Sequence, residues 1–384
     1  MIELKNLYKS YRGKSVLMNI SLTIQDNEFF VLIGSSGCGK TTLLKTLNKL
    51  NPIDKGEILI NGTPINRIKV TQLPRLMGYV VQEGGLFPHM TVEDNIALAM
   101  RVAGYPKEKI YDRITELLEL VNLEPDQYRS QYPSQLSGGQ RQRIGVARAF
   151  AADPEIILMD EPFSALDPMT RAELQDEVHR LQLRFHKTIV FVTHDMDEAV
   201  KLADRICILQ NGHVVQCDKP ENILKHPANE YINSFIGKNR LWENPSFIRA
   251  EDIMRPRPIT ISQSRTVVQE VQLMRHYNID SLLVTGDDNK FAGMVWLQDL
   301  IGIDQYSSPV SSFLSDDYLS VRVDDSLSTV LEKVADYGEK DFGILPVLDA
   351  EGAIRGFLNR SSLLSTLSRR FIDEPVERDE QEGA

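Results

Sequence analysis

Cysteines, long apolar runs and basic residues are all scarce in this 384-residue sequence. Cys38, Cys207 and Cys217 form no CxxC pair, so we expect neither a disulfide framework nor a zinc site. No stretch approaches the roughly 20 apolar residues of a membrane-spanning helix, and residues 1–11 lack the apolar segment of a signal peptide. We therefore expect a cytosolic chain that would serve a membrane only as a peripheral subunit.

The shortage of positive charge excludes a further class of protein. The 43 Lys and Arg residues are outnumbered by 54 Asp and Glu residues, which gives a formal net charge of -11. Binding to nucleic acid requires a basic face against the phosphate backbone, so we expect no nucleic-acid partner. The hydrophobic content of 42% is ordinary for a globular protein. The length predicts two or three domains.

Residues 1–237 alternate apolar strands with helical patterns, which predicts an α/β layer fold. Glu28–Ile33, Glu155–Asp160 and Thr188–Thr193 are apolar without alternation, as in parallel strands that are covered on both faces. Met169–Phe185 has the apolar spacing of a helix. Polar residues follow each strand, and open α/β sheets bind their ligands at that edge.

A glycine-rich segment between the first of these strands and a predicted helix fits the phosphate-loop pattern G-x-x-x-x-G-K-[ST]. The residues that we expect to surround a nucleotide are Gly34, Ser35, Ser36, Gly37, Cys38, Gly39, Lys40, Thr41 and Thr42. Glycines let backbone N–H groups approach phosphates, and the helix N-terminus adds a positive partial charge. We expect Lys40 to reach the β- and γ-phosphates, Thr41 to ligate Mg²⁺, and Cys38 to act as a small space filler.

Asp160 and Glu161 end the second apolar strand. An Asp at the tip of a strand beside a phosphate loop commonly holds the Mg²⁺ shell, and Glu161 is placed to act as general base on an attacking water. Alone, such a pair is more often a helix cap or a surface pair. The phosphate loop upstream favours the catalytic interpretation.

The segment Leu136-Ser137-Gly138-Gly139-Gln140 precedes a helical pattern rich in basic residues. Its free helix N–H groups suit an anion, although such a segment alone is more often an ordinary cap. Between a phosphate loop and IILMDE, it resembles the signature of ATP-binding cassette (ABC) ATPases. The resemblance covers roughly residues 1–237. It implies a mixed sheet with a helical subdomain, and ATP and Mg²⁺ as ligands.

The ABC resemblance also implies roles for isolated residues that would otherwise be interpreted as structural. Tyr11 lies where the family stacks an aromatic ring on adenine, and Gln82 matches the loop that senses the γ-phosphate, joins the Mg²⁺ shell and contacts the membrane subunit. Asp167 matches the loop that crosses a dimer interface, and His194 matches the switch histidine at the γ-phosphate. Together with Glu161, Gln82 and His194 form the expected catalytic set.

In the family, ATP lies between the phosphate loop of one subunit and the signature of the other. The resemblance therefore implies a homodimer with two competent sites, closed by ATP binding and opened by hydrolysis. It also implies integral membrane permease subunits and an extracytoplasmic substrate-binding protein as partners, with this chain at the cytoplasmic face of the membrane.

The remaining third of the chain contains an internal repeat. Ile279–Ile301 aligns without gaps on Phe342–Leu364, and Thr266–Met274 matches Ser326–Val334 in helical spacing. Such a repeat indicates two copies of one supersecondary unit that bury a shared core. It resembles a tandem pair of α/β CBS (cystathionine β-synthase-type) domains. The predicted boundaries are 1–237 for the ATPase domain, 238–250 for a linker, 251–307 and 308–370 for the CBS domains, and 371–384 for a disordered acidic tail.

An ABC ATPase followed by a CBS pair resembles the energising subunit of importers for quaternary amines, which take up glycine betaine, carnitine, choline or proline as osmoprotectants. There are three alternatives: an importer of another amine or amino acid, a soluble ABC protein of translation or repair, and a regulatory nucleotide sensor. A soluble ABC protein usually carries two cassettes or large insertions, which this sequence lacks. Intact Glu161 and His194 argue against a sensor with secondary ATPase activity.

CBS pairs often bind adenine nucleotides through a Thr or Ser and an Asp after a glycine turn. The first copy has Trp296 at the hydroxyl position and keeps Asp299, whereas the second has Asn359 and Ser362. These departures argue against simple AMP or ATP binding. Cyclic di-AMP binding, ionic-strength sensing and a purely dimer-stabilising role remain open.

Overall fold

The computed structural model describes residues 1–82, 85–237, 240–302, 306–315, 317–338 and 342–368. The chain divides into two compact units, Met1–Phe235 (unit 1) and Ile236–Ala384 (unit 2). The predicted acidic tail, 371–384, lies outside the described residues, as do the first two residues of the predicted linker.

The larger sheet of unit 1 has the order β10-β9-β3-β8-β7-β6. Its strands are β3 (Phe29–Ile33), β6 (Met77–Val80), β7 (Ile156–Asp160), β8 (Thr188–Val192), β9 (Arg205–Gln210) and β10 (His213–Asp218). Neighbours pair in parallel except β9 and β10, which are antiparallel. Every residue of β3, β7 and β8 is buried. This burial explains their unbroken apolar runs and confirms the three predicted strands.

A second, antiparallel sheet of unit 1 has the order β2-β1-β4-β5. Its strands are β1 (Ile2–Tyr11), β2 (Lys14–Ile24), β4 (Lys55–Ile60) and β5 (Thr63–Pro64). Side chains from both sheets share one apolar core, including Leu4 and Ile58 from this sheet and Leu32 and Val190 from the larger one. This shared core fixes the position of β3, and with it the start of the phosphate loop that follows β3.

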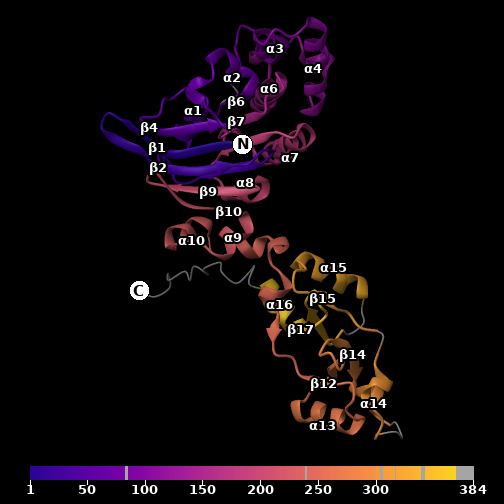
Figure 1. Ribbon diagram of the computed structural model, residues 1–384. Helices are drawn as coiled ribbons and strands as arrows, with labels where there is room; N and C mark the ends of the chain where they lie inside the picture. Colours follow the sequence, from indigo (N-terminus) through magenta and orange to yellow (C-terminus); the bar gives the residue numbers. More distant parts are fainter. Residues whose placement is uncertain (83–84, 238–239, 303–305, 316, 339–341, 369–384) are drawn as a thin grey trace, which may run out of the picture. The chain divides into compact units, whose positions relative to one another are not determined.

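Helices of unit 1 follow the parallel strands or gather in a separate layer. They are α1 (Lys40–Leu47), α2 (Leu73–Leu76), α3 (Val92–Val102), α4 (Lys107–Leu120), α5 (Pro125–Tyr128), α6 (Gly138–Ala151), α7 (Pro168–Phe185), α8 (Met196–Leu202), α9 (Pro220–Lys225) and α10 (Glu230–Ile236). α3, α4 and α6, which follow β6 and precede β7 along the chain, pack on one another and form the helical subdomain (Figure 1). α7 confirms the helix predicted at Met169–Phe185 and begins one residue earlier.

Unit 2 repeats one pattern, a strand and a helix followed by an antiparallel hairpin. The first copy has β12 (Thr260–Ser262), α13 (Val267–Tyr277), β13 (Ser281–Thr285), β14 (Phe291–Trp296) and α14 (Leu297–Leu300). The second has β15 (Val321–Arg322), α15 (Leu327–Tyr337), β16 (Ile344–Leu348), β17 (Ile354–Asn359) and α16 (Arg360–Ser368). Short elements precede them: α11 (Arg240–Glu243), α12 (Ala250–Ile253) and β11 (Arg255–Pro256), which pairs with β17.

The two copies confirm the predicted repeat. The hairpin strands β13 and β14 occupy the positions that the gapless alignment matches to β16 and β17. The helices α13 and α15 begin after Thr266 and Ser326, the first residues of the two upstream segments that match in helical spacing. In both copies the first strand pairs in parallel with the first hairpin strand, so each copy forms the same α/β unit. The two copies have separate apolar cores, which corrects the expectation of one shared core.

Candidate active site

The loop between β3 and α1 wraps around the start of the helix. Lys40 is the first residue of α1, and its buried ammonium donates to the carbonyls of Gly34 at 2.8 Å and Ser35 at 3.1 Å. A Cβ at Gly34 would lie 2.2 Å from the Leu209 carbonyl oxygen, and Gly39 has a φ of 112°. Only glycine fits these positions, so the loop keeps its backbone N–H groups accessible. Such a cradle fits phosphate.

Asp160 ends β7 beside this loop. Thr41 donates its hydroxyl to one carboxylate oxygen of Asp160 at 2.7 Å, and the hydroxyl of Tyr79 lies 3.3 Å from the other. Burial and the Asp160 charge both raise the pKa of Tyr79, which therefore stays a hydrogen-bond donor. Mg²⁺ prefers hydroxyl, carboxylate and phosphate oxygens, and it usually takes one or two carboxylates. The donor set of Thr41 and Asp160 fits this ion.

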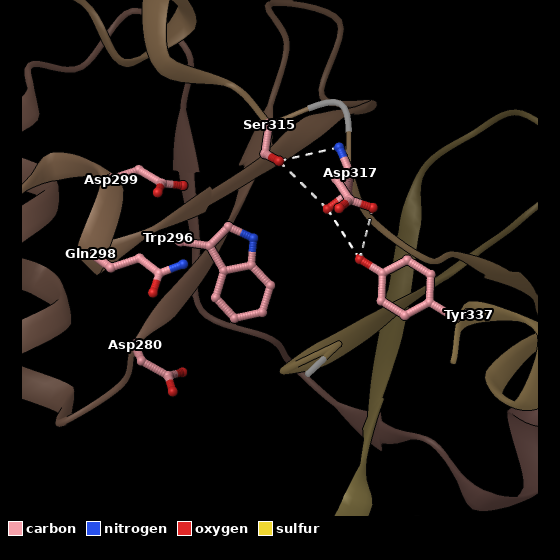
Figure 2. A pocket seen from close by; sticks show the side chains of 7 residues that line it. All are labelled: Asp280, Trp296, Gln298, Asp299, Ser315, Asp317 and Tyr337. Carbon is pink, nitrogen blue, oxygen red and sulfur yellow. Dashed lines mark hydrogen bonds between the residues drawn. The ribbon is translucent and has the colours of Figure 1, made fainter. Parts of the chain in front are cut away.

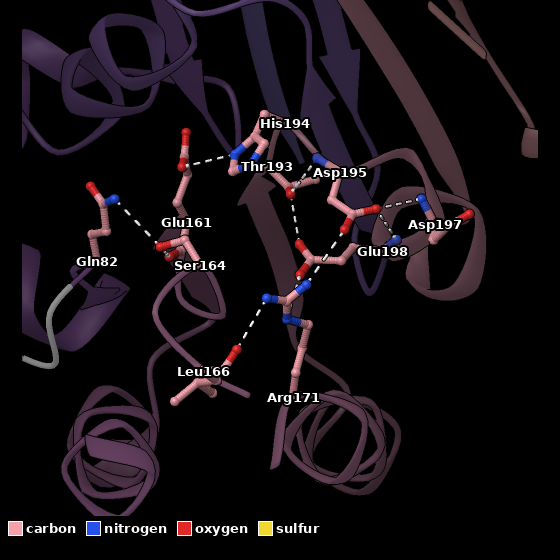
Figure 3. A network of polar contacts seen from close by, with 10 residues as sticks. All are labelled: Gln82, Glu161, Ser164, Leu166, Arg171, Thr193, His194, Asp195, Asp197 and Glu198. Atoms are coloured by element: carbon pink, nitrogen blue, oxygen red, sulfur yellow. Dashed lines mark hydrogen bonds and ion pairs between the residues drawn. The ribbon is translucent and has the colours of Figure 1, made fainter. Parts of the chain in front are cut away.

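Glu161 contacts His194 directly, whereas, among the described residues, Gln82 is linked to Glu161 only through Ser164 (Figure 3). Nδ1 of His194 lies 3.1 Å from Oε2 of Glu161. Glu161 has a φ of 46° and donates its N–H to the carbonyl of Val192 at 3.0 Å, which ties it to β8. Ser164 links Gln82 to Glu161. Its hydroxyl donates to the backbone carbonyl of Glu161 at 3.0 Å and accepts from the side-chain amide of Gln82 at 3.4 Å.

A buried network behind His194 was not predicted from the sequence. Thr193 donates its hydroxyl to Glu198 at 2.6 Å, and Asp195 caps α8. Arg171 joins α7 to these residues, because it donates to the Leu166 carbonyl at 3.1 Å and lies 3.7 Å from Asp195 (Figure 3). Burial raises the pKa of Glu198. The one indication of this network in the sequence is Glu198, which lies among apolar residues of the short helix α8.

A pocket of about 440 Å³ gathers the phosphate loop with two of the expected catalytic residues. Its lining residues are Val16, Ser36, Gly37, Gly39, Lys40, Thr41, Thr42, Glu161 and His194. Val16, from β2, was not predicted. Cys38 is buried behind the loop, and burial raises the pKa of its thiol, which disfavours the reactive thiolate. Tyr11 lies at the end of β1 outside the lining, with Lys9 Nζ 5.2 Å from its ring centroid.

The signature segment does not reach this pocket within the chain. Ser137 caps α6, because its hydroxyl accepts from the N–H of Gln140 at 3.2 Å while its own N–H donates to the Gln140 side chain at 2.9 Å. Ser137 and Gly138 are exposed, and Gly139 is half-buried. Asp167 is also exposed and caps α7 by accepting from the N–H of Thr170 at 3.1 Å. None of these residues lines the phosphate pocket.

Comparisons with known proteins agree with this geometry. A sequence profile for ABC transporters matches residues 17–164, and a profile for the CBS domain matches 250–304 and 310–369. The choline transport ATP-binding protein of Bacillus subtilis is 44% identical over 95% of this chain and 95% of its own length. The chain belongs to the quaternary-amine branch of the ABC transporter ATP-binding proteins. The osmoprotectant import ATP-binding protein of Salmonella typhimurium is 36% identical over 96% of both chains.

Solved structures support the fold of this ABC protein. A dimeric bacterial ABC transporter cassette, MJ0796, is 34% identical and superposes with a TM-score of 0.53 over 57% of this chain and 99% of its own. Membership of the family makes this protein an ATPase that uses ATP and Mg²⁺ and is coupled to transport, and implies a dimer with membrane partners. Among the described residues, no helix is long and apolar enough to cross a membrane.

Proposed function

We propose that this chain hydrolyses ATP at the cytoplasmic face of the membrane to drive import of a quaternary amine or related osmoprotectant, such as choline, glycine betaine, carnitine or proline. The observation that carries the proposal is the similarity to the choline transport protein, which spans the ATPase unit and the CBS pair alike. An importer of another amine or amino acid is the alternative.

The residues of the pocket take the following roles in this proposal. The phosphate loop, with Lys40, holds the phosphates, and Thr41, Gln82 and Asp160 hold Mg²⁺, which supplies charge neutralisation when bound. Glu161 accepts a proton from the attacking water, and its contact with His194 holds both side chains towards the pocket. Phosphoryl transfer depends on positioning and electrostatics, so the pocket needs little further chemistry.

The exposed signature supports a homodimer. Ser137, Gly138, Gly139, Gln140 and Asp167 lie outside the phosphate pocket of their own chain, and the N-terminus of α6 is accessible at Ser137 and Gly138. We expect these residues to complete the pocket of a second copy, with Tyr11 stacked on adenine. A site split between two copies makes hydrolysis conditional on closure of the dimer.

An apolar groove of about 470 Å³ supports docking of a permease on unit 1. It lies beside β6, α3 and α6, and Phe87, Leu98 and Val102 are among its lining residues. Val102 is 65% exposed and Phe87 is 42% exposed, so the groove presents apolar side chains to solvent, as interaction surfaces commonly do. A helix of the permease subunit fits such a groove. The extracytoplasmic substrate-binding protein then delivers the solute to the permease.

Transport by the assembled complex tests the proposal. The chain, its permease and its binding protein are reconstituted in liposomes with ATP inside, on the side of this chain. Uptake of labelled choline, glycine betaine, carnitine and proline is then compared with uptake of methionine. We expect ATP-dependent uptake of at least one quaternary amine. Uptake of methionine without uptake of any quaternary amine would overturn the assignment.

A pocket of unit 2 supports cyclic di-AMP as a regulator of this transporter. It has a volume of about 710 Å³, and its lining includes Arg275, Asn359, Arg360 and Ser361. Guanidinium groups are the usual partners of phosphates. We propose that cyclic di-AMP binds there and changes ATP hydrolysis by the complex. Calorimetric titration of the full chain, repeated with Arg275→Gln, tests this, and equal affinity in both chains would contradict it.

A further inference from the structure

Unit 2 contains a second pocket, which shares Asp280 with the first and whose chemistry suits a cation. It has a volume of about 470 Å³. The end of β14 and the start of α14 line one side, and the segment before β15 and the last residue of α15 line the other (Figure 2). Its lining residues are Asp280, Trp296, Gln298, Asp299, Ser315, Asp317 and Tyr337. Among these described residues are three carboxylates and two aromatic rings but no Lys, Arg or His. The pocket therefore favours positive charge.

The aromatic rings of this pocket are held in place. A Cβ at Gly343 would lie 2.7 Å from Cη2 of Trp296, so the indole packs directly on the backbone of the second CBS copy. The hydroxyl of Tyr337 donates to the carboxylate of Asp317 at 3.1 Å, and the N–H of Asp317 donates to the hydroxyl of Ser315, also at 3.1 Å. Figure 2 shows the indole between Asp280 and Asp299 on one side and Asp317 and Tyr337 on the other.

Two of the carboxylates are not neutralised within the part of the chain that the structure describes. The carboxylate of Asp299 has neither a hydrogen bond nor an ion pair there, and the carboxylate of Asp280 accepts only a weak hydrogen bond from the Ser281 hydroxyl at 3.4 Å. A bound cation would relieve the repulsion between these like charges, whereas a phosphate group would add to it. Aromatic faces attract cations, and quaternary ammonium groups are commonly recognised by aromatic rings in this way.

We propose that this pocket binds a small organic cation of the quaternary ammonium class. Choline carries the positive charge and a neutral hydroxyl, so it should bind more tightly than glycine betaine, whose carboxylate would face the three aspartates. Nucleotides should bind most weakly here. The proposal concerns binding by unit 2 and does not depend on which solute the transporter imports.

The fluorescence of Trp296 provides the test. The chain has only two tryptophans, Trp242 and Trp296, so Trp242→Phe leaves one emitter inside the pocket. Tetramethylammonium chloride or choline chloride is titrated into the full chain at constant ionic strength, with NaCl as the balancing salt. We expect a saturable change in emission, with an affinity for choline at least about threefold higher than for glycine betaine, since one exposed charge contact is worth up to ~1 kcal/mol. Calorimetry on the unsubstituted chain gives the same comparison without the Trp242 substitution.

A pair of matched substitutions locates the binding. Asp299→Asn removes one carboxylate of the pocket, and Asp287→Asn removes one from the exposed turn between β13 and β14, outside the lining. We expect Asp299→Asn to weaken choline binding at least about threefold and Asp287→Asn to leave it unchanged. Equal loss in both variants would show that only overall charge matters. No saturable change, or tighter binding of AMP or cyclic di-AMP with Trp296 responding, would also overturn the proposal.

Discussion

The phosphate pocket of unit 1 and the acidic pocket of unit 2 have similar volumes, about 440 and 470 Å³, but opposite chemistry. The first is built mainly from the backbone of one glycine loop with Lys40 beside it. The second is built from side chains that range from Asp280 to Tyr337. The difference shows that an anion site can be contained in one short motif, whereas a cation site of this kind requires a folded domain.

Buried acids differ between the two units as well. In unit 1, Glu177 pairs with Arg143 and accepts from Asn122, and Glu198 accepts from Thr193. In unit 2, both carboxylate oxygens of Glu270 on α13 are buried without a hydrogen-bond partner among the described residues. The repeat places Val330 at the equivalent position of α15. Burial raises the pKa of Glu270 to about 7.

The largest expected effect concerns Glu161 in the phosphate pocket of unit 1. Glu161→Gln should bind ATP and favour the closed dimer, yet lower turnover by about 10² to 10⁴-fold, because the general base is lost. ATPase assays and size-exclusion chromatography with ATP check both parts. Glu155→Gln is the matched control, since Glu155 is exposed and contacts Asn61 away from the pocket. Normal turnover in Glu161→Gln would remove Glu161 from the role of base.

A smaller effect tests the buried acid of unit 2. The folded-state pKa of Glu270, about 7, exceeds its ordinary value of 4.5. Its contribution to stability is therefore fully present below pH 4.5 and is lost as the pH rises through 7. We expect Glu270→Gln to remove this pH dependence and to raise the stability of unit 2 at pH 8 by roughly 1 to 3 kcal/mol.

Thermal unfolding of the full chain between pH 4 and 8 measures this difference. The exposed Glu332 on α15 provides the control, because Glu332→Gln makes the same chemical change without altering a buried group. A pH dependence that persists unchanged in Glu270→Gln would contradict the assignment to Glu270.

The smallest expected effect concerns the exposed signature. Ser137→Ala removes the hydroxyl that caps α6 and should destabilise unit 1 by about 1 kcal/mol. Calorimetric unfolding without ATP measures this change. Ser134→Ala is the matched control, because Ser134 is exposed and its side chain makes no hydrogen bond within the described ranges. An equal shift in both variants would show that the cap contributes nothing to stability.

The motifs along the chain predicted much of the fold and the candidate site. The strands at β3, β7 and β8, the helix α7 and the repeat of unit 2 were confirmed, because each depends on local periodicity or on a gapless match. The roles of Glu161, His194 and the signature stay predictions. Arg171 and Glu198 were missed, since their contacts join residues whose types alone carry no motif.

The sequence by itself determined the phosphate loop, because six of the nine residues that line the pocket lie in the consecutive segment from Gly34 to Thr42. Only the tertiary structure decided that Asp160 meets Thr41 at 2.7 Å and that the signature stays outside the pocket of its own chain. It also decided that Trp296, at a position where related domains carry a hydroxyl, lies between carboxylates rather than beside bases. The physical reason is range: hydrogen bonds and charges act over a few ångströms in space, whatever the separation along the chain.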